Sequence, residues 1–253
     1  MSGKASTDEI RRMHRLHAIQ RLIGWLVAPL WVPTAALVMR FRFGLQIEDL
    51  RRIRRENRQI RRASDAPLLI CANHLTLVDS FLIAWALRSP WAYVFDYDSL
   101  PWNTPEETNF ATTPLRRILV YLGKCIPIRR GGDRGDVAMV LARIIHAVGR
   151  REVALLFPEG GRSRSGRIEE GAGAWGVGRV VGAIDGCRVL CVYLRGRQQE
   201  NWSDFPVQGD SLYVDIACIE PKSDHRGARR SRDLAHQIVG QLQRMEEAYF
   251  DGR

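Results

Sequence analysis

Residues 67–79 read PLLICANHLTLVD, and this stretch decides the expected fold. Its first part, residues 67–72, is a short apolar run bounded by polar residues, which predicts a buried strand. Residues 77–87 predict a helix with Thr76 as its N-cap and Asp79 at its third position, the spacing of a capping box. The stretch therefore predicts a strand-to-helix junction with a histidine in the connecting loop.

His74 and Asp79 stand five positions apart, and on an ideal helix their side chains would point about 140° apart. They can meet only if His74 lies in the loop before the helix and folds back. Asp79 could then hold one ring nitrogen and leave the other free as a general base. The alternative is that Asp79 only caps the helix and that His74 is an ordinary loop histidine.

A second strand is predicted over residues 151–157, and Pro158 ends it because proline has no N–H to donate to a neighbouring strand. The loop that follows contains a carboxylate, two glycines and an arginine, namely Glu159, Gly160, Gly161 and Arg162. The glycines would let backbone amides approach a ligand closely, and the planar guanidinium suits a phosphate. The alternative is a glycine-rich surface turn with a solvated arginine.

Further segments complete the expected domain. Residues 123–132 predict a short strand ending in Arg129 and Arg130, whose charges would either complete a phosphate site or be solvated. Residues 187–194 predict a core strand, and residues 229–250 a closing amphipathic helix. A tightly packed helix is expected at four closely spaced glycines, Gly171, Gly173, Gly176 and Gly178. We therefore expect a single α/β domain with a largely parallel central sheet flanked by helices.

These blocks resemble those of the glycerolipid acyltransferases, typified by 1-acylglycerol-3-phosphate acyltransferases. The family's Asn-His-x4-Asp block is matched by Asn73, His74 and Asp79. Its Phe-Pro-Glu-Gly-Thr-Arg-Ser block is matched by residues 157–163, with Gly161 in place of the threonine.

The other two blocks of the family are matched less closely. Residues 123–129 match a Gly-x-Ile-Phe-Ile-x-Arg-like block, with Pro127 in place of the aromatic residue. Residues 189–192 match the apolar strand of the fourth block but lack its central proline. The similarity spans roughly residues 68–194.

The resemblance implies that His74 is the general base and that Asp79 orients it. It implies an acceptor site formed by Glu159, Gly160, Gly161 and Arg162, with Arg129 helping to hold the acceptor's phosphate. The donor would be an acyl thioester on coenzyme A or acyl carrier protein, with no cofactor, metal or covalent acyl-enzyme. A thioester has a good leaving group, so positioning together with general-base catalysis can suffice.

Composition favours an anionic partner inside the cell. The net charge is +10 and the isoelectric point is about 9.9, which suits a membrane surface or an acidic carrier protein. Neither a zinc-finger spacing nor an aromatic–basic RNA signature is present, so we expect no nucleic-acid partner. The five cysteines are scattered and odd in number, which indicates reduced cytoplasmic thiols.

Residues 22–39 carry no charge and lie between Arg21 and Arg40. As a helix they would reach about 27 Å, with prolines to kink it and tryptophans suited to a membrane interface. We expect a kinked element that enters the cytoplasmic leaflet and returns. A single membrane span and a buried core helix are the alternatives, and a signal peptide is not expected because a highly basic segment follows.

Residues 47–62 predict a basic amphipathic helix whose natural partners are anionic lipid headgroups. We therefore expect an N-terminal membrane-docking region over residues 1–62 and an acyltransferase domain over residues 63–253.

These observations together predict a membrane-bound O-acyltransferase at the cytoplasmic face. The expected acceptor is a lysophospholipid, 1-acylglycerol 3-phosphate, and the product is phosphatidate. One alternative is another acceptor, a lyso-aminolipid or glycerol 3-phosphate. The other is a non-catalytic, membrane-bound basic protein on the same fold. Four intact residues argue against it, since a protein without activity has no chemical reason to keep His74, Asp79, Glu159 and Arg162.

Overall fold

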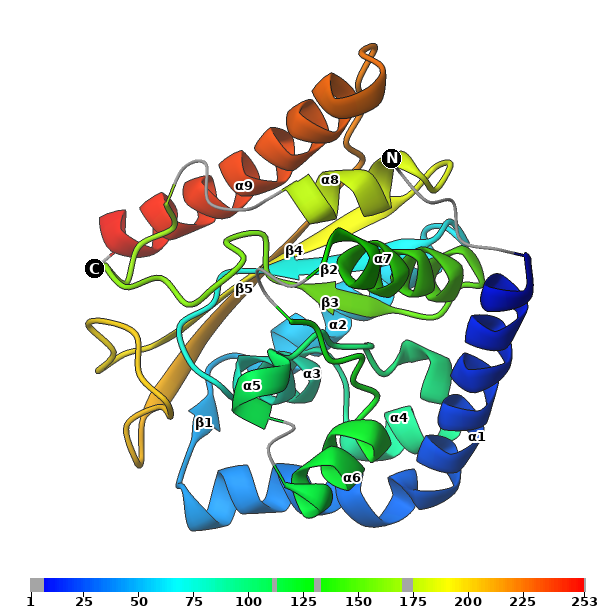
Figure 1. The fold of residues 1–253 in the computed structure, drawn as a ribbon. Coiled ribbons are helices and arrows are strands. Elements are labelled where there is room, and N and C mark those ends of the chain that lie inside the picture. Colours follow the sequence, from blue (N-terminus) through cyan, green and yellow to red (C-terminus); the bar gives the residue numbers. More distant parts are fainter. Residues whose placement is uncertain (1–6, 111–112, 130–132, 170–174, 253) are drawn as a thin grey trace.

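The structure of the protein, a computed structural model, describes residues 7–110, 113–129, 133–169 and 175–252. A five-stranded sheet forms its centre (Figure 1). The strands lie in the order β1 (Gln46–Ile47), β5 (Ser211–Ile219), β4 (Arg188–Gly196), β2 (Leu68–Ala72) and β3 (Ala154–Leu156). β2 pairs in parallel with both β3 and β4, β1 pairs in parallel with β5, and the β4–β5 pair is antiparallel. The expected α/β class with a largely parallel sheet is confirmed.

Helices cover both faces of the sheet. Alternate residues of a strand point to opposite faces, and in β2 Leu69 and Cys71 join one core cluster while Leu68, Ile70 and Ala72 join the other. The first cluster includes residues of α7 (Arg134–Gly149), α8 (Trp175–Gly182) and α9 (Gly227–Asp251). The second includes residues of α2 (Leu50–Arg62) and α3 (Asp79–Leu87). Both faces of β2 are buried, which explains its unbroken apolar sequence.

The closing helix α9 confirms the amphipathic pattern expected near the C-terminus, because Leu234, Ile238, Leu242 and Met245 are all buried. Of the four glycines expected in a packed helix, Gly171 and Gly173 lie outside the described residues. Gly178 lies in α8 against the backbone of Ser231 on α9, where a Cβ would overlap it. The absence of a side chain there lets the two helices approach closely.

Several element boundaries differ from the expectations. Helix α3 begins at Asp79 rather than Leu77, and its N-cap is Val78, so Thr76 is not the cap and no capping box forms. The strand expected over residues 151–157 is limited to Ala154–Leu156, since Arg151 has a φ of 68°. The helix expected from residue 47 begins at Leu50, because Gln46 and Ile47 form β1.

The strand expected over residues 123–132 is wrong within the described residues. Only isolated bridges form there, from Cys125 to Asn103 and from Ile128 to Glu106. Lys124 adopts a φ of 56°, which interrupts an extended chain, and its side chain turns into the core. Residues 130–132 lie outside the described residues.

Helix α1 (Thr7–Leu37) runs along the edge of the molecule and continues as a π-helix, η1 (Val38–Arg42). Figure 1 shows that it bends along its course, and Pro29 and Pro33 lie inside it. Residues 22–37 are helical throughout, and the expected entry into the cytoplasmic leaflet and return stays a prediction. With η1 the helix is long and apolar enough to cross a membrane by length and composition, and only 17% of its most apolar window is buried. A buried core helix is therefore excluded.

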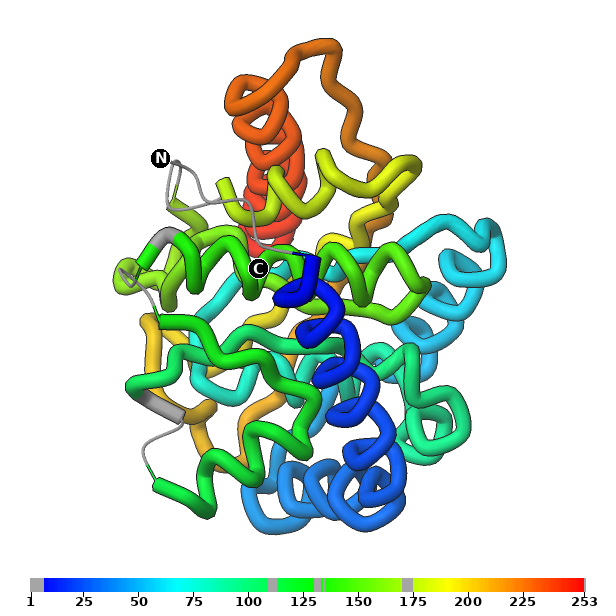
Figure 2. Tube along the Cα trace, turned by 45° about the vertical axis from the view of Figure 1, so that its right-hand side comes forward, coloured from blue at the N-terminus to red at the C-terminus, as the bar shows by residue number. Residues whose placement is uncertain are grey.

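Shorter helices surround α1. Helices α4 (Pro90–Phe95) and α6 (Pro114–Leu122) contact it on either side, as Figure 2 shows, whereas α5 (Glu107–Phe110) contacts α6. A 3-10 turn, η2 (Tyr97–Ser99), follows α4. Two elements lie before the boundary expected at residue 62: β1 is a strand of the sheet, and α2 packs against β5.

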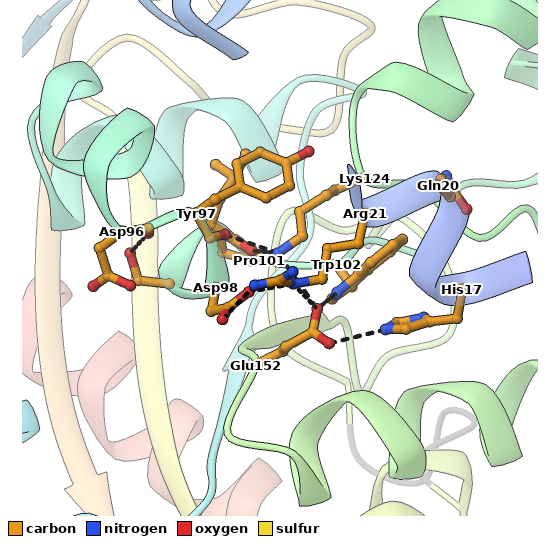
Figure 3. Close-up of polar contacts among 12 residues, drawn as sticks. His17, Gln20, Arg21, Asp96, Tyr97, Asp98, Pro101, Trp102, Lys124 and Glu152 are labelled. Atoms are coloured by element: carbon orange, nitrogen blue, oxygen red, sulfur yellow. Dashed lines mark hydrogen bonds and ion pairs between the residues drawn. The ribbon is translucent and has the colours of Figure 1, made fainter. Parts of the chain in front are cut away.

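The buried carboxylate of Glu152 attaches α1 to the domain (Figure 3). His17 Nε2 lies 3.0 Å from Glu152 Oε1, and Trp102 Nε1 donates to Oε2 at 2.7 Å. Lys124 Nζ lies 3.8 Å from Oε2 and donates to the carbonyls of Tyr97 and Leu100. Beside this cluster, Arg21 forms a bidentate pair with Asp98. These contacts fix the rotation of α1 about its axis and leave its apolar side exposed.

The charges of this cluster shift the pKa values of its members. Burial disfavours the ionised form of Glu152, but His17, Lys124 and Trp102 outweigh it and lower its pKa to about 2. Burial lowers the pKa of Lys124 to about 7, against the attraction of Glu152. The carboxylate of Glu152 is therefore stabilised by its partners and not by solvent.

We predict that Glu152→Gln lowers the free energy of unfolding at pH 7 by about 3 kcal/mol, because it removes the carboxylate that His17, Lys124 and Trp102 stabilise by lowering its pKa to about 2. The folded pKa of Glu152 lies below its ordinary value, so its contribution is present above about pH 4.5 and is lost as the pH falls toward 2. Urea unfolding across this pH range measures both effects. Glu247→Gln, at an exposed position of α9, is the matched control, and an equal loss in the two variants would contradict the prediction.

Candidate active site

The loops that follow β2 and β3 emerge side by side, because these strands are parallel neighbours with Cys71 opposite Leu156. The first loop is tied to β4 by the side chain of Asn73. Its Nδ2 donates to the carbonyl of Leu194 at 2.9 Å, and its Oδ1 accepts from the Leu194 amide at 2.8 Å. The second loop is tied to the first, since the Ser163 amide donates to the carbonyl of His74. The two motif loops thus form one unit at the carboxyl edge of the sheet.

The carboxylate of Asp79 organises the first loop. Its Oδ2 accepts from the backbone amides of Leu75 and Thr76 at 2.7 and 2.8 Å, and its Oδ1 accepts from the Thr76 hydroxyl at 2.5 Å. His74 Nδ1 lies 3.0 Å from Oδ2. His74 therefore folds back from the loop as the spacing requires. Because a carboxylate faces Nδ1, that nitrogen carries the proton and Nε2 is left as the basic nitrogen.

Two residues of the second loop also hold His74. Its ring stacks on Phe157, with centroids 4.0 Å apart and an angle of 14° between the planes. Its backbone amide donates to Glu159 Oε1 at 2.9 Å. The ring is thus fixed by Asp79 and Phe157 and the backbone by Glu159, whereas the sequence had pointed to Asp79 alone.

Glu159 is buried under the loop and is not among the residues that line the adjoining cavity. Burial raises the pKa of Glu159 to about 8, and the charges of Glu246 and Asp79 act in the same direction, while the His74 amide opposes them. Its Oε2 is buried and has no hydrogen-bond partner in the part of the chain that the structure describes. At neutral pH the protonated acid is therefore the favoured form.

A cavity of about 740 Å³ opens beside His74. Its lining includes three arginines, Arg116, Arg162 and Arg164, one acidic residue, Glu106, and apolar side chains such as Leu77, Phe81 and Leu119. Ser80, Phe81 and Asn103 also line a narrower apolar cavity between α1, α3 and α4. The arrangement fits a ligand that combines an anionic group with a hydrocarbon chain.

The remaining expected site residues lie in different surroundings. Gly160 has a φ of 67°, the left-handed conformation that glycine favours, and Gly161 lines the cavity. Arg162 also lines it, where Nη1 donates to Asp204 Oδ1 at 2.7 Å and the guanidinium lies over the ring of Trp202. Arg129 pairs with Glu107 Oε2 at 3.2 Å, is 60% exposed and does not line the cavity.

The cations that join Arg162 in the cavity are therefore Arg116 and Arg164. Sequence reasoning missed Arg116 because it lies in α6, outside the motif blocks. Arg164 could have been found from the sequence, because it comes directly after the second motif block, residues 157–163. Among the described residues, no group of three His, Cys, Asp or Glu side chains could hold a metal ion.

Comparison with known proteins agrees with these motifs. A family model described as Acyltransferase matches residues 46–195. This range contains both motif loops, the strands β1, β2 and β3, and β4 as far as Arg195. No protein of curated function matches the chain. Since the family match covers more than half of the 253 residues, the chain belongs to the acyltransferase family, of the glycerolipid acyltransferase type.

Proposed function

We propose that this acyltransferase moves a fatty acyl group from a thioester donor, acyl-CoA or acyl carrier protein, to the hydroxyl of 1-acylglycerol 3-phosphate. The observation that carries the proposal is the position of His74. Its ring is held through Nδ1 by Asp79 and lines a cavity whose lining includes three arginines and several apolar side chains. A lysophospholipid combines the matching phosphate and acyl chain with a reactive hydroxyl.

In this reaction His74 Nε2 takes the proton of the acceptor hydroxyl as its oxygen attacks the thioester carbonyl carbon. A C–O bond forms and the carbonyl electron pair moves onto oxygen. The return of that pair breaks the C–S bond, and the leaving thiolate takes the proton from Nε2. Asp79 stabilises the imidazolium that exists between the two proton transfers.

Among the described lining residues, the three arginines of the cavity outnumber its one acidic residue, Glu106, and support a phosphate-bearing acceptor. Arg162, Arg164 and Arg116 line the cavity, and guanidinium groups form paired hydrogen bonds with phosphate oxygens. Asp204 and Trp202 hold Arg162 in place, so that less side-chain freedom is lost when the acceptor binds. The narrower apolar cavity beyond Phe81 has room for part of an acyl chain.

Glu159 acts in this proposal as a positioning residue beneath His74 and not as a ligand of the acceptor. Its oxygen accepts the His74 amide from below the loop, and its raised pKa favours the neutral acid. A neutral acceptor orients the loop without placing a second negative charge beside Asp79.

The exposed apolar surface supports docking on a membrane at the cytoplasmic face. Large apolar side chains are exposed on three neighbouring helices, including Leu26 and Leu30 on α1, Phe95 on α4, and Leu115 and Ile118 on α6. Apolar patches of this kind mark interaction sites. α6 also contributes Arg116 and Leu119 to the cavity, so the cavity lies next to this surface. All five cysteines are free thiols, in keeping with a reducing compartment.

Replacing the base tests the chemistry. We expect His74→Ala to lower kcat/KM by about 10²–10⁴ while the folded structure is retained. Initial rates of purified protein with lysophospholipid and both donor types measure the loss, and circular dichroism reports the fold. His236→Ala, at an exposed position of α9, should leave the rate unchanged. Near-normal turnover by His74→Ala would remove the proposed role.

Replacing Glu159 tests its positioning role and its charge. Glu159→Gln keeps an oxygen acceptor for the His74 amide, so it should retain most activity, whereas Glu159→Ala should lose it.

The raised pKa of Glu159 means that the folded protein holds a proton that the unfolded chain releases between about pH 4.5 and 8. Wild-type stability should therefore fall as the pH rises through this range, and Glu159→Gln should lack that decline. Denaturant unfolding at several pH values measures this dependence of stability on pH. Equal loss of activity in Glu159→Gln and Glu159→Ala would contradict the proposal that Glu159 acts as a neutral hydrogen-bond acceptor.

The acceptor assignment is tested at Arg162. We expect the wild type to prefer 1-acylglycerol 3-phosphate to monoacylglycerol by at least about tenfold in kcat/KM, since each charge-assisted hydrogen bond contributes about 1.5–3 kcal/mol. Arg162→Ala should erase most of this preference by lowering activity on the phosphorylated acceptor alone. Arg129→Ala is the matched control and should keep the preference. If Arg162→Ala lowers kcat/KM by the same factor on both acceptors, Arg162 does not bind the phosphate, and the acceptor is instead a lyso-aminolipid or another molecule.

Membrane docking is tested on α1. Leu30 is 75% exposed, so Leu30→Asp should leave the fold intact, yet it should weaken binding to phospholipid vesicles by at least about tenfold, because a carboxylate resists transfer into the bilayer. Ala248→Asp adds the same charge to an exposed position of α9 and should have little effect. Co-sedimentation with vesicles measures both, and equal binding by the two variants would show that α1 does not face lipid.

A further inference from the structure

We propose that an arginine pocket between α2 and α4 binds the phosphate of an anionic phospholipid headgroup, at a site separate from the catalytic cavity. The pocket has a volume of about 380 Å³. Among the described residues that line it, five are arginines, namely Arg54, Arg58, Arg61, Arg62 and Arg88, and one, Asp96, is acidic. The inference rests on the membrane docking proposed above and adds to it a specific ligand site.

The arginines converge on the pocket from two elements. Four belong to α2, where Arg58, Arg61 and Arg62 follow Arg54 by four, seven and eight residues. These spacings place the four along one helix face. The fifth, Arg88, follows the last residue of α3. Attraction to the helix dipole accounts for Arg61 and Arg62 in the last turn of α2. It does not account for Arg54 in the first turns or for Arg88 on another element.

The positive charge of the pocket exceeds what its acidic residue can balance. Arg88 Nη1 donates to Asp96 Oδ2 at 2.5 Å, and Arg61 Nη2 reaches the same oxygen at 3.9 Å. Burial and the neighbouring charge of Arg88 lower the pKa of Arg61, and burial lowers that of Arg54. Arg54 Nη2 donates to the carbonyl of Trp85, but its Nε is buried without a hydrogen-bond partner among the residues that the structure describes. An anion in the pocket would relieve the repulsion between these guanidinium groups.

The surroundings favour a phosphate attached to a lipid over a free anion. Helix α4 supplies Ala92 to the pocket and is followed by Asp96, and it exposes Trp91 at 56% and Phe95 at 85%. It packs against α1 through a core cluster that includes Ala28, Val32 and Tyr93. Aromatic side chains at a membrane surface sit near the headgroups, so a protein docked through Trp91 and Phe95 would present the arginines at the depth of the phosphates.

Among the described residues, the pocket shares no lining residue with the cavity beside His74, although Arg88 also lines the narrower apolar cavity. Helix α3 begins at Asp79, which holds His74, and Arg88 follows its other end. Nine helical residues span about 13 Å, so the pocket lies at the opposite end of α3 from the base. A lipid bound there is therefore not positioned as an acyl acceptor, and it would instead orient the enzyme on an anionic bilayer.

The test compares two charge-reversed pairs on one helix. Arg58→Glu with Arg62→Glu changes two exposed residues of the pocket, whereas Arg51→Glu with Arg55→Glu changes two exposed residues of α2 that do not line it. Both pairs alter the net charge equally. Affinity is measured for vesicles of phosphatidylcholine with and without phosphatidylglycerol. We expect the pocket pair to lose at least about tenfold more affinity for the anionic vesicles than the other pair.

Equal losses in the two pairs would overturn the proposal, because they would reflect general surface charge. The proposal would also be overturned if the pocket pair bound the anionic vesicles with the affinity of the wild type. Inorganic phosphate is the second probe. If it raises the Tm of the wild type but not of the pocket pair while the vesicle affinities of the two pairs stay equal, the pocket is a free-anion site and the lipid assignment fails.

A third measurement separates this inference from the proposed reaction. On a water-soluble, short-chain lysophospholipid the pocket pair should turn over at the wild-type rate, since the pocket is remote from His74. A wild type without acyl transfer would overturn the proposed reaction but leave the vesicle comparison valid. A pocket pair that loses the soluble reaction as well would place the arginines in the catalytic machinery and overturn the separate site.

Discussion

The parallel pairing of β2 with its two neighbours is the constraint on which the site depends. Parallel strands present their carboxyl ends at one edge, so the loops after β2 and β3 meet although more than 80 residues separate His74 from Glu159. The side chain of Asn73 extends this order by pairing with Leu194 on β4. The loop that carries His74 is therefore anchored to both neighbouring strands before any substrate binds.

Three buried carboxyl groups show how local partners decide what an acidic residue does. Asp79 accepts from two backbone amides, a hydroxyl and the His74 ring, so its charge is spread over four donors. Glu152 is surrounded by His17, Trp102 and Lys124, which lower its pKa. Burial raises the pKa of Glu159, with a smaller contribution from neighbouring acidic groups, and the His74 amide does not offset it. Asp79 therefore suits electrostatic support of the base, whereas Glu159 suits a neutral acceptor.

Helix α1 combines a polar attachment with an apolar outer side. The residues that face the domain include His17, Gln20 and Gly24 at helical spacing, and the polar ones bond to Glu152, the 121–125 segment and Arg143. Directional hydrogen bonds fix one rotation of a helix more strictly than apolar contacts do. The outer side can then remain apolar without the helix turning inward, as the proposed membrane docking requires.

The sequence by itself determined the elements whose pattern is local: the strands at residues 67–72 and 187–194, the amphipathic α9, the apolar α1, and the two motif loops with His74 and Asp79. Periodicity and motif spacing are sufficient there, because neighbouring residues create the signal. Only the tertiary structure decided the rest. Lys124 leaves its expected strand because its ammonium group meets carbonyls of residues 97 and 100 in the core. Arg116 replaces Arg129 beside Arg162, and Glu159 moves under the loop, because these places depend on segments distant in sequence.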